Sequence, residues 1–111
     1  MDQLWDFLVS VQEAITKHPG VLPRAIWEVR FTDLEVVVSV DGQRCICAMG
    51  NPSRADCWIK VPFSEVDRLM RSPMRALWLK LTGALSTSDD GGALALGRAL
   101  LELARLEGRL G

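Results

Sequence analysis

The sequence is short of several features that common functions need. Its 111 residues include one His, no Tyr and three Cys. Lys and Arg number 13 against 14 Asp and Glu, so the net charge of −1 lacks the positive excess that nucleic-acid binding uses. No apolar run approaches the roughly 20 residues of a membrane-spanning helix. We therefore expect neither a nucleic-acid partner nor a transmembrane segment.

Both ends of the sequence lack targeting signals. Residues 1–6 contain two acids and neither Lys nor Arg, unlike a secretory or transit peptide. Residues 109–111 match neither a peroxisomal nor a prenylation signal. An odd number of cysteines gives no disulfide framework. The expected location is the cytoplasm, where thiols stay reduced.

Catalytic groups are scarce. The only histidine, His18, precedes a proline at the end of a predicted helix, where a surface cap is its expected role. Asp89 and Asp90 form an adjacent pair, but they stand just ahead of a predicted helix, which favours capping over acid–base chemistry. No nucleophile elbow, Walker loop or dinucleotide-binding fingerprint is present. The sequence predicts a protein that is not an enzyme and needs no cofactor.

The cysteines are the only candidates for a metal site. Cys45 and Cys47 are two residues apart, so on one strand they would share a face, with Cys57 on the next strand. The spacing is not that of a zinc site, and a buried cysteine is more often a small apolar residue. Core packing is therefore preferred, and no metal site is predicted.

Apolar residues are what the sequence has in excess, at 49% with a mean hydropathy of +0.14. Their spacing is helical over residues 3–17 and alternates over residues 25–61. Helical spacing returns over about 64–71, 73–81 and 90–106, with a short strand at 84–87. One α+β domain over residues 1–111 is predicted, with a mostly antiparallel five-stranded sheet packed against helices.

Within the alternating segment, four strands with short links predict an antiparallel meander. Asp41-Gly42 is the strongest hairpin signal. Trp27 lies on the apolar face of the first strand, while Trp5 and Trp78 lie on apolar helical stripes. Each buried indole N–H needs a partner, so several Trp suit either a well-satisfied core or a site with room in it.

Three segments carry a resemblance to a known family. They are Ile26–Phe31 with the following Asp41-Gly42, Ala55–Val61 running into Phe63–Val66, and Gly83–Ala95. In this order and spacing, residues 22–103 resemble the sterol carrier proteins, also called nonspecific lipid-transfer proteins. The third segment departs from the family pattern, because Asp89 stands where a glycine is usual.

The resemblance implies a hydrophobic tunnel between sheet and helices that holds a fatty acyl, sterol or isoprenoid lipid for carriage or presentation. The alternative is a non-enzymatic accessory module with a reduced or closed cavity, working with a protein partner or as a homodimer. In that case Trp58 and the glycine-rich start of the last helix would form a docking surface. The residues predicted to contact a ligand are Trp27, Val29, Phe31, Met70, Met74, Leu77, Trp78, Leu81, Leu96 and Leu100.

Overall fold

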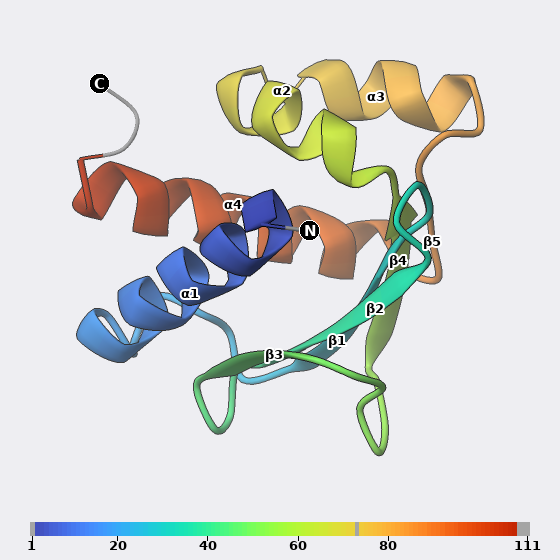
Figure 1. The fold of residues 1–111 in the computed structure, drawn as a ribbon. Coiled ribbons are helices and arrows are strands. Elements are labelled where there is room, and N and C mark those ends of the chain that lie inside the picture. Colours follow the sequence, from blue (N-terminus) through green and yellow to red (C-terminus); the bar gives the residue numbers. More distant parts are fainter. Residues whose placement is uncertain (1, 73, 109–111) are drawn as a thin grey trace.

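The computed structural model describes residues 2–72 and 74–108 and has the predicted α+β architecture (Figure 1). Its helices are α1 (Asp2–Lys17), α2 (Val66–Arg71), α3 (Met74–Leu81) and α4 (Asp90–Leu106), with a 3-10 turn η1 (Phe63–Glu65) before α2. Its strands are β1 (Ile26–Phe31), β2 (Val36–Asp41), β3 (Ile46–Met49), β4 (Cys57–Val61) and β5 (Ser86–Thr87). Pro73, the predicted first residue of the third helix, lies outside the described residues. Over these two ranges, every helix is too short or too polar to cross a bilayer.

The five strands form one sheet in the order β3-β2-β1-β4-β5. Three of its strand pairs are antiparallel, but β4 runs parallel to β1, so the predicted meander is wrong for the fourth strand. The reason lies in residues 50–56, which carry the chain past β2 to the far side of β1 instead of closing a hairpin. Asp56 fixes the start of this parallel pair: its N–H donates to the Ile26 carbonyl at 2.8 Å, and its Oδ2 accepts from the Ile26 N–H at 2.9 Å.

One face of the sheet is covered by α1 and α4, and the other is open (Figure 1). The alternation of β1 and β4 is confirmed, since Cys57, Ile59 and Val61 are buried while Trp58 and Lys60 are exposed. On the same inner face the core collects residues from every large element, among them Leu4, Leu8, Ile15, Trp27, Val29, Phe31, Val38, Val40, Leu96, Ala99 and Leu103. These buried side chains pack between this part of the sheet and the two long helices.

Gly42 lies in the predicted hairpin, but this position requires glycine because the backbone of Pro23 packs against it. A Cβ at this position would stand 1.7 Å from the Pro23 carbonyl oxygen, and the Gly42 N–H donates to the Ala25 carbonyl at 2.7 Å. Within this turn the residue with a left-handed backbone conformation is Cys45, whose φ is 57°. Because Cys45 precedes β3, which begins at Ile46, the predicted sharing of a strand face with Cys47 is wrong.

The start of the η1–α2 segment is held by a carboxylate from far away in the sequence. Asp33 Oδ1 accepts from the Phe63 N–H at 2.7 Å, and Oδ2 accepts from the Ser64 N–H at 3.0 Å. A serine followed three residues later by an acid, as in Ser64 and Asp67, resembles a capping box, but neither η1 nor α2 has a side-chain capping bond. Desolvation would raise the pKa of Asp33, but the two backbone hydrogen bonds outweigh it and hold that pKa below its usual value.

Replacing Asp33 by alanine should lower the free energy of unfolding by about 1 kcal/mol, the usual cost of losing a helix cap. Because the pKa of Asp33 is lowered in the folded state, this stabilisation is present above the unfolded pKa and is lost as pH falls through the folded one. Urea denaturation at about pH 7 and about pH 3 should therefore show a smaller difference between wild type and variant at the lower pH. Glu13→Ala removes an exposed acid from α1 and serves as the control. An equal loss in both variants at neutral pH would contradict the capping role.

Candidate functional site

An apolar groove lies between α1, η1, α2 and α4, and we call it the helix groove. Its volume is about 350 Å³. Four elements build it, and the residues that line it are Gln3, Asp6, Phe7, Ser10, Val11, Ala14, Phe63, Val66, Asp67, Met70, Leu100, Leu103, Ala104 and Glu107. A second hollow of about 420 Å³ lies between α1 and β3, beside Trp5 and Met49. These two side chains are 62% and 45% exposed. Because the helix groove is built by four elements and the second hollow by two, we take the helix groove as the candidate binding site.

The inner wall of the helix groove is aromatic. Phe7 and Phe63 line it with ring centroids 5.6 Å apart at 73°. Behind them lies buried Phe31, whose centroid is 5.1 Å from that of Phe63 and 6.3 Å from that of Phe7. Such edge-to-face contacts are favourable between aromatic rings. This cluster joins the wall of the groove to the sheet.

Ion pairs set the position of α2 relative to α3. Arg75 donates from Nε to Glu65 Oε2 at 3.1 Å and from Nη2 to Oε1 at 3.2 Å, and Arg68 also pairs with Glu65 at 3.2 Å. The hydrogen bond from Arg75 holds the pKa of Glu65 below its usual value. With this geometry α2 presents Val66 and Met70 to the groove.

Glu107, which lines the groove, joins the end of α4 to the end of α1. His18 Nε2 lies 3.1 Å from Glu107 Oε2, and Lys17 Nζ lies 3.5 Å from Oε1. The hydrogen bond with His18, together with the charge of Lys17, lowers the pKa of Glu107 although partial burial opposes this. Glu107 is therefore an ionised rim residue at neutral pH.

Few of the predicted ligand contacts lie at the helix groove. Met70 and Leu100 line it, and Phe31 stands directly behind it. Trp27, Val29 and Leu96 are buried in the core. The Trp27 N–H donates to the Gly92 carbonyl at 3.0 Å, which satisfies the one polar atom of this side chain. Four of the predicted residues lie elsewhere, on α3: Met74, Leu77, Trp78 and Leu81.

The apolar stripe of α3, which carries four of the predicted ligand contacts, is exposed. Met74 and Leu81 are 73% and 75% exposed, and only Leu79 of this helix is buried. Trp5 on α1 is exposed in the same way at 62%. Helical spacing identifies an apolar face, but it does not say whether another element covers that face. As ligand contacts the four α3 residues remain a prediction.

Sequence reasoning missed the contribution of α1 to the groove. Gln3, Phe7, Ser10 and Ala14 line it at positions i, i+4, i+7 and i+11. This second face runs beside the buried stripe that includes Leu4, and helical spacing puts all four residues on one side of the helix. Small residues at two of the positions were the available signal, because they leave room beside a neighbouring helix.

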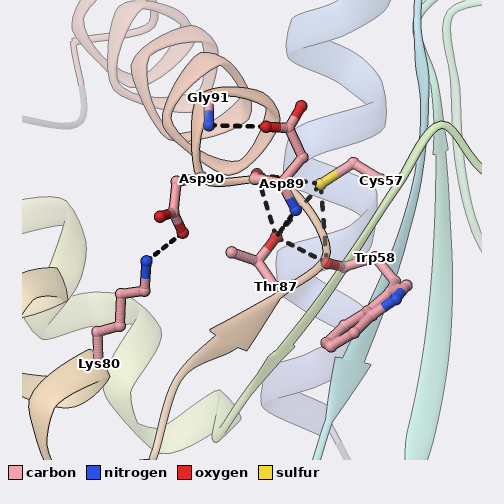
Figure 2. Close-up of polar contacts among 7 residues, drawn as sticks. All are labelled: Cys57, Trp58, Lys80, Thr87, Asp89, Asp90 and Gly91. Atoms are coloured by element: carbon pink, nitrogen blue, oxygen red, sulfur yellow. Dashed lines mark hydrogen bonds and ion pairs between the residues drawn. The ribbon is translucent and has the colours of Figure 1, made fainter.

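The start of α4 packs tightly against β4 and β5 (Figure 2). Asp89 caps the helix, with Oδ1 accepting from the Gly91 N–H at 3.2 Å. The Cys57 sulfur lies 3.3 Å from Thr87 Oγ1 and 3.6 Å from the Asp89 carbonyl oxygen. Figure 2 also shows the ion pair between Lys80 and Asp90, which joins α3 to α4. Across residues 2–72 and 74–108 no group of three potential metal ligands occurs. The contacts among Cys57, Thr87 and Asp89 join β4, β5 and the start of α4, and we call this cluster the joint.

The two glycines of this joint should differ in their tolerance of alanine. A Cβ on Gly92 would stand 3.1 Å from the sulfur and 3.2 Å from the Cβ of buried Cys57, whereas one on Gly91 meets only an Asp89 oxygen at 3.6 Å. Alanine favours helix at both sites, so Gly91→Ala should be neutral or stabilising. Gly92→Ala should be less stable than Gly91→Ala by about 1–2 kcal/mol in urea denaturation. Equal stability of the two variants would show that Cys57 can move aside.

Comparison with known proteins supports the architecture. No protein-family model matches the sequence, and no curated protein matches it. Among solved structures, a UbiJ-SCP2 ubiquinone synthesis protein has a TM-score of 0.62 at 15% identity over 96% of this chain and 89% of its own. The sterol carrier protein domain 2 of Helicoverpa armigera has a TM-score of 0.63 at 13% identity over 97% and 91%.

The inverting sec-alkylsulfatase Pisa1 from Pseudomonas sp. is also similar, with a TM-score of 0.58 at 16% identity. The match covers 73% of this chain but 13% of the sulfatase, so it concerns one part of that enzyme. At these identities the likeness concerns the fold. The order of elements, the mixed sheet and these neighbours agree, and the chain has the α+β fold of the SCP2 domains.

Proposed function

We propose that the protein binds an apolar lipid-like ligand, of fatty acyl, sterol or isoprenoid type, in the helix groove, for carriage or presentation. The observation that carries this proposal is the groove itself, about 350 Å³ in volume with mostly apolar walls. Such a volume lies within the usual range of small-molecule sites. The SCP2-like fold adds support, because one of the similar structures, from Helicoverpa armigera, is named as a sterol carrier protein domain.

The driving force is the transfer of the lipid tail from water to the groove. Each buried CH₂ contributes about 0.8 kcal/mol, so ten such groups supply roughly 8 kcal/mol before the costs of association. Met70 and Leu100 offer side chains that are half-buried and free to adapt. Methionine is especially suited to tails of variable shape, because it is unbranched and polarizable.

Two matched substitutions test where the ligand binds. Met70→Asp puts a charge into the helix groove, while Met74→Asp puts the same charge on the exposed face of α3. With a pyrene-labelled long-chain alcohol as the probe, Met70→Asp should weaken binding at least about tenfold, because desolvating an unpaired carboxylate is costly. Met74→Asp should stay within about twofold of wild type. Circular dichroism of both variants checks that the fold is retained.

Other results of this binding experiment would favour a different site or a different function. A selective loss in Met74→Asp would place the ligand against α3, as the sequence predicted for Met74, Leu77, Trp78 and Leu81. Failure of the wild-type protein to bind the probe, with no lipid retained in native mass spectrometry, would contradict lipid binding. The accessory module with a closed cavity would then be favoured, and the exposed apolar face of α3 is the feature that supports it.

A further inference from the structure

Every charged residue that lines the helix groove is acidic, and the other polar residues that line it are neutral. These residues are Gln3, Asp6, Ser10, Asp67 and Glu107, of which three are acids. Among the lining residues that the structure describes there is no Lys, Arg or His. A lipid tail in this groove would therefore bring its head group to a rim of carboxylates and neutral hydrogen-bonding groups.

The cations near this rim already have acidic partners. Lys17 and His18 lie against Glu107 at 3.5 and 3.1 Å, and Arg71 Nε lies 3.3 Å from Asp67 Oδ2. None of these three basic residues lines the groove. The Glu107 side chain is only 13% exposed, so its charge is held close to these two cations. A lipid carboxylate that reached one of the three basic residues would have to share it with the acid already paired with it.

Neutral partners for a head group stand on α1. The Gln3 amide and the Ser10 hydroxyl can each donate and accept a hydrogen bond. Gln3, Phe7 and Ser10 stand at positions i, i+4 and i+7, so all three lie on the same side of α1. A hydroxyl could donate to a rim carboxylate and accept from either group, whereas a carboxylate can only accept.

From this arrangement we infer that the helix groove selects lipids with an uncharged hydroxyl or carbonyl head over the corresponding long-chain carboxylates. The inference rests on the proposed function and narrows it. A lipid carboxylate meets like charges at the rim and loses water, and each of the three basic residues beside the rim is already paired with an acid. Several charges are exposed, so salt screens the repulsion and the expected discrimination is moderate.

The test compares ligands that share one tail. A twelve-carbon alcohol and the twelve-carbon carboxylate compete with the pyrene-labelled alcohol at low ionic strength and neutral pH. The alcohol should bind about tenfold more tightly. Because a carboxylate is also better hydrated than an alcohol, the decisive comparison uses a rim variant, Asp6→Asn with Asp67→Asn, in which both changed residues line the groove. The carboxylate should gain about fivefold in affinity for this variant, and the alcohol should change by less than twofold.

The control variant, Asp2→Asn with Glu13→Gln, removes the same charge from exposed positions of α1 that do not line the groove. It should leave both affinities within about twofold of wild type. Equal binding of alcohol and carboxylate to the wild type, or the same gain in the rim and control variants, would overturn the inference while leaving lipid binding intact. If neither ligand binds, the proposed function fails and the inference fails with it.

Discussion

Among the glycines within residues 2–72 and 74–108, Gly42 should be the one least tolerant of alanine. The added Cβ would lie 1.7 Å from the Pro23 carbonyl oxygen and 2.8 Å from the Pro23 carbonyl carbon, well inside contact distance. Both are backbone atoms, so no side-chain rotation relieves the overlap. The Gly42 N–H also donates to the Ala25 carbonyl at 2.7 Å, and separating the two segments would break this bond. We expect a loss of about 3 kcal/mol or more, at the upper end of overpacking effects.

Urea denaturation followed by circular dichroism measures this loss. The control is Gly20→Ala, where a Cβ would meet nothing within 4 Å and Gly20 is exposed. The control should stay within about 0.5 kcal/mol of wild type. If Gly42→Ala folds as stably as the control, then the close approach of the connector 19–25 to the β2–β3 turn is wrong.

Trp27→Ala should have the second large effect. Trp27 is 1% exposed and is among the largest fully buried side chains. Its removal would leave a cavity between β1 and α4 and leave the Gly92 carbonyl without its indole partner. Truncations of buried Trp or Phe cost about 3–5 kcal/mol, which a domain of this size could hardly survive. Trp27→Phe keeps much of the volume and should cost less, mainly through the lost hydrogen bond.

Trp58→Ala is the matched control, because Trp58 is 37% exposed on the outer face of the neighbouring strand. It packs under Lys60, whose Nζ lies 5.2 Å from the ring centroid, a contact worth about 0.5–1 kcal/mol at an exposed site. Thermal unfolding should therefore separate the two alanine variants clearly. Similar losses in both would mean that the outer face of the sheet is covered in solution.

Local patterns predicted the elements better than they predicted their arrangement. Alternation along β1 and β4 depends on adjacent residues, and the burial of Trp27, Ile59 and Val61 confirms it. The parallel pairing of β4 with β1 depends on the path of residues 50–56, which alternation cannot reveal. Asp33 lies 30 residues before the Phe63 N–H group that donates to it, so no local capping motif could indicate this cap.

The candidate site was predicted in part for the same reason. Met70 and Leu100 lie on apolar stripes that do face the helix groove. The stripe of α3 is as regular, yet Trp78 and Leu81 on it are exposed. Whether a stripe is covered depends on how the α2–α3 segment is anchored, here by the ion pairs of Glu65. Spacing along one helix carries no information about such contacts.

The most direct test of the binding site is the methyl NMR spectrum of the protein titrated with the twelve-carbon alcohol. We expect shifts for methyl groups that line the helix groove, with Val66, Met70 and Leu100 moving together along one binding curve. Met74 and Leu81 should stay in place, because they lie on the exposed face of α3. Shifts confined to α3, or none at any ligand concentration below aggregation, would contradict the assignment of the helix groove as the lipid site.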